Sequence, residues 1–117
     1  MNLQQIIDHL ELKPLTQTQD FSQVEPKSGY TADLLSCVMA GAKAHCIWVT
    51  LQAHVNIIAV AALLDMSAII ITEGAQPDQA TITKANAQSI PVLSTPRSTF
   101  DIVGELWSLG LRSIETA

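Results

Sequence analysis

The chain has 117 residues, of which 48% are hydrophobic and 15% charged, and its formal net charge is −5. This length and composition predict one domain, residues 1–117, whose hydrophobic core needs neither disulfides nor a metal. The acidic excess disfavours nonspecific binding to nucleic acid or to anionic membranes, and the longest apolar run, 55–64, is too short to span a bilayer. Because residues 1–5 lack a signal-peptide pattern and charged surface is scarce, we expect a cytoplasmic homodimer.

The first third of the chain predicts short elements. Apolar residues at helical spacing indicate an amphipathic helix over 3–10. Short strands are expected around 12–16 and 21–25, followed by a turn or loop over 26–29. Thr31 is the expected N-cap of a helix over 32–42.

From residue 47 onward, strand and helix patterns alternate. The predicted elements are strand 47–51, helix 54–65, strand 68–72, helix 78–89, strand 91–94 and helix 99–109. Ser98 and Asp101 offer a start like a capping box for the last helix, and Gly110 offers its stop. This alternation predicts an α/β fold, a three-layer sandwich in which helices cover both faces of a mostly parallel sheet.

Three further features predict residues that are buried by other parts of the protein or by a second subunit. The helix over 54–65 has almost no polar face after Asn56, so we expect it either between layers or in a subunit interface. Gly104, inside the last predicted helix, indicates the close approach of another element. Cys37 and Cys46 are expected to be reduced and mostly buried, because no secretory signal precedes them.

Polar residues follow three predicted strands, at the points where these strands end. Because the carboxyl ends of parallel strands meet at one edge of a sheet, these residues are expected to line one crevice. Hydroxyl, amide and imidazole groups, helix N–H groups and one guanidinium suit a small anionic ligand. The predicted ligand-binding residues are Thr50, Gln52, His54, Asn56, Thr72, Gly74, Thr95 and Arg97. The alternative is that these residues cap helices and satisfy the buried backbone, with Arg97 paired to Glu73 or Asp101.

Metal and catalytic sites are weaker interpretations of the same chain. His45, Cys46 and His54 carry zinc-ligating groups, but no zinc-site spacing occurs and the two histidines lie at opposite ends of a predicted strand. We therefore predict no metal and no other cofactor. The only catalytic pairing that the sequence suggests joins His54 to Glu73 or Ser94, and no phosphate-binding loop with the Gly-x-x-x-x-Gly-Lys-Ser/Thr pattern occurs. We predict that the protein is not an enzyme.

An ordered series of segments resembles a known family. These segments are SGYTADLLSCVMA (28–40), WVTLQAHVNIIAVA (48–61), AIIITEG (68–74), IPVLST (90–95) and TFDIVGEL (99–106). Together they resemble stand-alone DRTGG-domain proteins over nearly the whole chain. The resemblance implies an α/β fold shared with the N-terminal domain of HPr kinase/phosphorylase. It also implies a regulatory role, with adenine nucleotides bound near a dimer interface.

The chain departs from the motif that names this family at two places. Ala53-His54 stands where the family has Asp-Arg, and Thr72-Glu73-Gly74 stands where it has Thr-Gly-Gly. The first change removes an arginine that would pair with phosphate, and the second adds a negative charge. The Gln-x-His-x-Asn pattern at 52–56 resembles a subgroup found beside iron hydrogenase and NADH-linked electron-transfer proteins.

The sequence thus predicts a non-catalytic regulatory or sensor domain. Its expected ligand is a small phosphorylated metabolite or an adenine nucleotide, bound at the carboxyl ends of the strands. The alternative is a ligand-free interaction subunit of an electron-transfer or metabolic complex.

Overall fold

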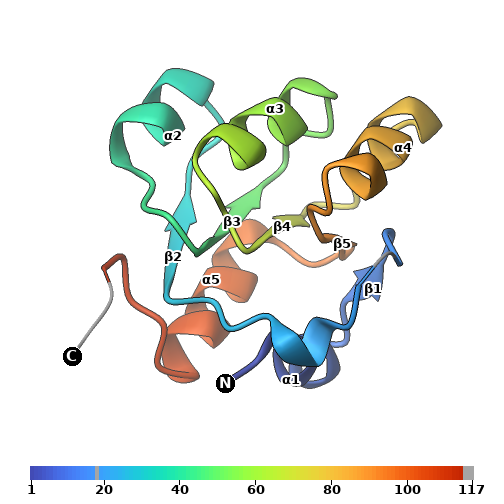
Figure 1. Cartoon of the computed structure of the whole chain (residues 1–117). Coiled ribbons are helices and arrows are strands. Elements are labelled where there is room, and N and C mark those ends of the chain that lie inside the picture. The colour runs from blue at the N-terminus through green and yellow to red at the C-terminus, as the bar shows by residue number, and fades with distance from the viewer. Residues whose placement is uncertain (18, 115–117) are drawn as a thin grey trace.

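The computed structural model describes residues 1–17 and 19–114, and its five strands form one sheet in the order β1-β5-β4-β3-β2 (Figure 1). Four neighbouring strands run parallel: β2 (Ser28–Thr31), β3 (Cys46–Thr50), β4 (Ala68–Ile71) and β5 (Val92–Ser94). The fifth, β1 (Lys13–Pro14), is antiparallel to β5. The predicted, mostly parallel sheet is therefore confirmed.

Helices cover both faces of this sheet. The connecting helices α2 (Leu35–Gly41), α3 (Asn56–Leu63) and α4 (Gln79–Ala87) lie on one face, and α1 (Leu3–Leu10) and α5 (Thr99–Ser108) lie on the other (Figure 1). Because β2 to β5 are neighbours in chain order, right-handed crossovers place all three connecting helices on the same face. The three-layer α/β fold is confirmed. Across the described residues, no helix is long and apolar enough to cross a membrane.

The segment between residues 20 and 35 differs from the predictions. The expected strand at 21–25 contains instead the short 3-10 helix η1 (Phe21–Gln23), and the expected loop at 26–29 runs into β2. Thr31 ends β2, and its hydroxyl donates to the carbonyl of Val49 at 2.8 Å, so it caps no helix. Helix α2 begins only at Leu35, without a side-chain cap. Pairing with β3 outweighs the local turn signal of this segment, because strand formation depends on tertiary context.

The second half follows the predictions, with element ends displaced by one or two residues. The hydroxyl of Ser98 accepts the N–H of Asp101 at 3.1 Å, which confirms the predicted start of α5. Gly110 follows the end of α5 with φ 103°, a left-handed conformation that glycine adopts without steric cost. The strong helix and strand periodicity of this half is therefore sufficient to place its elements.

The core consists of two clusters, one on each face of the sheet. Successive residues of β3 alternate between them: Ile47 and Val49 pack with α1 and α5, whereas Trp48 packs with α2 and α3. The Trp48 side chain is fully buried, and its indole Nε1–H donates to the carbonyl of Ala32 at 2.9 Å. The central strands are covered on both faces, as a parallel sheet requires.

Within the described residues, the burial predicted for α3 between layers and the close approach predicted at Gly104 are not found. Helix α3 lies in an outer layer, with Ile57 and Ile58 buried but Leu63 69% exposed, so its placement between layers is wrong. The interface interpretation of this helix stays a prediction. No atom of the described residues lies within 4 Å of the position that a Cβ would take at Gly104, so the close approach expected there is absent.

The two cysteines are both free but lie in different environments. Cys46 is fully buried, as predicted, whereas Cys37 is exposed, so the prediction of burial is wrong for Cys37. Cys37 lies on α2, where Val38 is the residue that the helix buries. Burial raises the pKa of the Cys46 thiol from its ordinary value of 9.0 to about 11.

Burial of Cys46 predicts a loss of stability in alkaline solution. The folded protein holds the thiol proton up to about pH 11, whereas the unfolded chain releases it near pH 9. Because the unfolded state binds fewer protons in this interval, the free energy of unfolding falls as the pH rises through it. Thermal unfolding from below pH 9 to pH 11 should show a smaller fall in Cys46→Ala than in the parent protein. The matched variant Cys37→Ala should behave as the parent, and an unchanged fall in Cys46→Ala would contradict the prediction.

Candidate functional site

Hydrogen bonds bring three segments together at the carboxyl edge of the sheet. The N–H of Thr72 donates to the carbonyl of Thr50 at 3.0 Å, and the N–H of Thr95 donates to that of Ile71, also at 3.0 Å. The N–H of Gly74 donates to the carbonyl of Thr95 at 3.1 Å. The chain after β3, β4 and β5 therefore forms adjacent loops, and the structure gathers Thr50, Thr72, Gly74 and Thr95 at one edge.

Three of the predicted ligand-binding side chains lie inside this edge. Thr50, Thr72 and Thr95 are 0%, 0% and 3% exposed. The hydroxyl oxygens of Thr72 and Thr99 lie 2.5 Å apart, and the hydroxyl of Thr95 accepts the N–H of Arg97 at 3.2 Å. These hydroxyls hold the loops in place, and the surface around them is formed by their neighbours in the sequence.

Asp33 is the central residue of this edge, and it was not among the predicted site residues. Its Oδ1 accepts the hydroxyl of Thr50 at 2.8 Å and the N–H of Leu51 at 3.0 Å. Its backbone carbonyl accepts the side-chain amide of Gln52 at 3.1 Å. Asp33 was expected within the helix over 32–42. If β2 had been predicted, Asp33 would have been a candidate for the site, because it follows the carboxyl end of that strand.

His54 and Asn56 lie at the start of α3. The imidazole Nδ1 of His54 accepts the N–H of Asn56 at 3.1 Å, which places the proton of the neutral ring on Nε2. Both side chains are exposed, and among the described residues the Nε2–H of His54 donates no hydrogen bond. The hydrogen bonds that Asp78 accepts from Thr81 lower the pKa of Asp78, and the nearby His54 lowers it further, to a smaller extent, when its ring carries a charge.

The carboxylate of Glu73 occupies the position at the start of α5 where an anion could bind. Glu73, in the left-handed conformation with φ 60°, accepts the N–H of Thr99 on its carboxylate at 2.7 Å. Arg97 forms an ion pair with Glu105 on α5, rather than with Glu73 or Asp101 as the sequence suggested. This hydrogen-bonded pair raises the pKa of Arg97 above its ordinary value. The anion position at this helix start is thus filled by a carboxylate.

The exposed groups of this edge are mainly acidic. Asp33, Glu73 and Asp78 are exposed around it, while the charge of Arg97 is balanced by Glu105. Carboxylates only accept hydrogen bonds when ionised, so this edge favours the hydroxyl and amino groups of a ligand over a bare phosphate. Among residues 1–17 and 19–114, no group of three His, Cys, Asp or Glu side chains is placed to hold a metal ion.

The fold and its polar edge define an α/β domain of the class that offers a ligand crevice at the carboxyl ends of parallel strands. The model of the DRTGG domain matches residues 30–108. The chain belongs to the DRTGG domain family, as its resemblance implies. No curated protein matches its sequence significantly.

A solved structure has the same fold. It contains the CBS and DRTGG domains of the regulatory region of Clostridium perfringens pyrophosphatase, complexed with the activator diadenosine tetraphosphate. The two chains share 20% sequence identity and superpose with a TM-score of 0.72, over 97% of this chain and 47% of that one. This chain thus spans about half of that regulatory region. That structure belongs to a regulatory region. A regulatory role for this chain, the absence of catalysis and the relation to HPr kinase/phosphorylase stay predictions.

Proposed function

We propose that this protein is a regulatory or sensor domain that binds an adenine nucleotide or another small phosphorylated metabolite at the carboxyl edge of its sheet. The observation that supports the proposal is the hydrogen bonding that joins the loops after β3, β4 and β5 at one edge, since Gln52, His54 and Gly74 belong to the segments that follow β3 and β4. A structure with the same fold was solved with a dinucleotide activator, which supports this ligand class.

The charges of the site suggest how such a ligand would be held. The exposed carboxylate of Asp33 would accept ribose hydroxyls, and the outward Nε2–H of His54 would donate to a phosphate oxygen. The left-handed turn at Gly74, with φ 73°, leaves the backbone open to close approach. The phosphate of the ligand would lie away from Glu73, because like charges repel.

Regulation would follow from a change in the population of two arrangements. We infer a homodimer in which the ligand binds one quaternary arrangement more tightly than the other, so that a partner protein can distinguish the two. Only such a difference in affinity allows the ligand to shift the equilibrium between them.

Thermal unfolding against a nucleotide panel tests this function. ATP, ADP, AMP, diadenosine polyphosphates and NAD should be compared, with the oligomeric state followed by sedimentation. A specific ligand well above its dissociation constant is expected to raise the unfolding temperature by several degrees. The rise should vanish in Gln52→Ala and in His54→Ala, and persist in Gln88→Ala, an exposed glutamine at the end of α4. The absence of a rise with every nucleotide would refute the function.

The second candidate is a ligand-free interaction subunit of an electron-transfer or metabolic complex. It is favoured by apolar side chains on the outer surface of two helices that pack against each other. Leu63 on α3 is 69% exposed and Met39 on α2 is 48% exposed. Under this candidate, Leu63→Lys would weaken assembly while Gln52→Ala would not, and nucleotides would have no effect on unfolding.

A further inference from the structure

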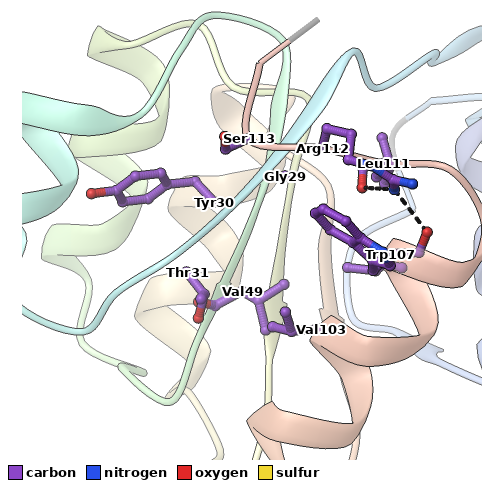
Figure 2. Close-up of a pocket in the computed structure, with 10 residues that line it drawn as sticks. Gly29, Tyr30, Thr31, Val49, Val103, Trp107, Leu111, Arg112 and Ser113 are labelled. Carbon is purple, nitrogen blue, oxygen red and sulfur yellow. Dashed lines mark hydrogen bonds between the residues drawn. The ribbon is translucent and has the colours of Figure 1, made fainter. Parts of the chain in front are cut away.

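An open cavity lies between the edge strand β2 and helix α5, on the face of the sheet away from α2, α3 and α4 (Figures 1 and 2). Its volume is about 310 Å³, within the range of small-molecule sites. The lining is mostly apolar and includes Val49, Val103, Leu106, Trp107 and Leu111. The cavity belongs to the side of the sheet opposite to the side chain of Thr50, so it is distinct from the crevice described above.

The cavity exists because only two helices cover this face. Gly29 and Thr31 of β2 pair with Ile47 and Val49 of β3, and therefore face the same side as the α1 and α5 cluster. Apart from Gly29 itself and its two chain neighbours, no heavy atom of the described residues lies within 4 Å of the position that a Cβ would take at Gly29. Glycine weakens a strand interior, and it often marks the place where a ligand or another backbone approaches. A larger side chain at residue 29 would fill the cavity.

One wall of the cavity is an exposed tryptophan. The indole of Trp107 is 58% exposed, and the guanidinium of Arg112 lies 3.6 Å from the ring centroid (Figure 2). The Nη1 of Arg112 donates to the carbonyls of Trp107 and Leu111, both at 2.9 Å. The face of an aromatic ring attracts a cation. Trp107 therefore forms an aromatic wall at the mouth of the cavity, with Arg112 over one face of its ring.

The backbone of β2 supplies polar groups beside this apolar wall. The N–H of Gly29 points away from β3 and donates to the carbonyl of Arg112 at 2.7 Å. Because alternate residues of a strand direct their backbone groups to the same side, Thr31 presents its N–H and C=O along the same edge. An apolar cavity with a few directed polar groups is typical of small-molecule sites, in which the polar groups fix the orientation of the ligand.

We propose that this cavity binds one flat heteroaromatic ring of the size of a purine or an indole. The ring would pack between Val49, Val103 and Trp107, and its rim would form hydrogen bonds with the backbone of Thr31. The ring could come from a free aromatic metabolite or from the base of a nucleotide. The proposal does not depend on the function of the crevice.

Nuclear magnetic resonance of the full chain labelled with ¹⁵N tests the proposal. Adenosine, indole and ribose 5-phosphate are the probes, and the last of them has no aromatic ring. Adenosine or indole should shift the amide signals of Gly29 and Thr31 and the indole N–H signal of Trp107. The indole signal of buried Trp48 should stay in place as an internal control. A shift with indole alone would identify a free aromatic metabolite as the natural class, and a shift with adenosine alone would identify a nucleobase.

Two variants with a matched control locate the binding. Gly29→Val, which fills the cavity, is expected to weaken ring binding by at least about tenfold. Gly104→Ala adds a methyl group at another open glycine and should leave the affinity unchanged. Trp107→Leu, at an exposed side chain that the core does not need, should also weaken binding if Gly29→Val fails to fold.

Three outcomes would overturn the proposal. They are the absence of shifts with both aromatic probes, equal shifts with ribose 5-phosphate, and unchanged affinity in a folded Gly29→Val or in Trp107→Leu. Shifts of Gln52, His54 and Gly74 amides alone would support the crevice and reject the cavity. Shifts at Gly29 and Trp107 alone would do the reverse, so the two sites are tested separately.

Discussion

Replacement of Asp33 by alanine is expected to lower the free energy of unfolding by about 2–3 kcal/mol. The carboxylate of Asp33 accepts two hydrogen bonds, from the hydroxyl of Thr50 and the N–H of Leu51, and so joins the ends of β2 and β3. Thr50 is fully buried, so its hydroxyl cannot turn to water when its partner is lost. Bonds to a charged acceptor are the stronger kind, although the exposure of Asp33 moderates their effect. Denaturant titration of both proteins measures the difference.

The matched control is Asp33→Asn. Asparagine keeps an acceptor oxygen of the same geometry but loses the charge, so it should retain more than half of the stability that alanine loses. The proposed crevice adds a second readout, because Asp33→Ala should also abolish the nucleotide-dependent rise in unfolding temperature. A stable Asp33→Ala protein, within about 0.5 kcal/mol of the parent, would contradict the role of Asp33.

Replacement of Glu73 by alanine is expected to cost about 1–2 kcal/mol. Its carboxylate accepts the N–H of Thr99 at 2.7 Å, and a negative charge at the start of α5 also interacts favourably with the helix dipole. Alanine removes both effects and still has to adopt the left-handed conformation of residue 73, with φ 60°. Thermal and denaturant unfolding of the variant measure the loss.

Two further substitutions separate the causes. Glu73→Gln keeps an acceptor and should lie between the parent protein and the alanine variant. Glu73→Gly removes the carboxylate but adopts the left-handed conformation without strain, so it should be more stable than Glu73→Ala. If the alanine and glycine variants are equally stable, backbone strain at residue 73 contributes nothing.

The agreement between sequence and fold differs along the chain for a physical reason. After residue 47, long apolar runs alternate with helical periods, and the predicted elements match β3 to α5 within two residues. Between residues 20 and 35, the local signals of Pro26 and Gly29 favour a turn, yet the chain enters the sheet as β2. This strand is stabilised by pairing with β3, which is distant in sequence, and such pairing leaves little trace in a local pattern.

The candidate site, like the fold, could be predicted from the sequence only in part. The polar residues after β3, β4 and β5 could be identified because each follows a recognisable strand. The solvent accessibility of these residues could not be predicted, because the burial of Thr50, Thr72 and Thr95 depends on how the three loops pack. Asp33 was missed because its strand was missed. The sequence suggested Glu73 or Asp101 as the salt-bridge partner of Arg97, whereas the tertiary structure brings its guanidinium to Glu105.

The sequence by itself determined the α/β class, the mostly parallel sheet and the polar character of the carboxyl edge, because these follow from periodicity and from residue types along the chain. Its resemblance to the DRTGG family, carried by the order of its segments, indicated the family. Only the tertiary structure decided which polar groups face solvent, that the edge is acidic, and that a cavity lies open beside β2. Those properties arise where segments distant in sequence meet. Gly29, Trp107 and Arg112 form one cavity because the chain after α5 returns to the edge of β2, where the carbonyl of Arg112 accepts the N–H of Gly29.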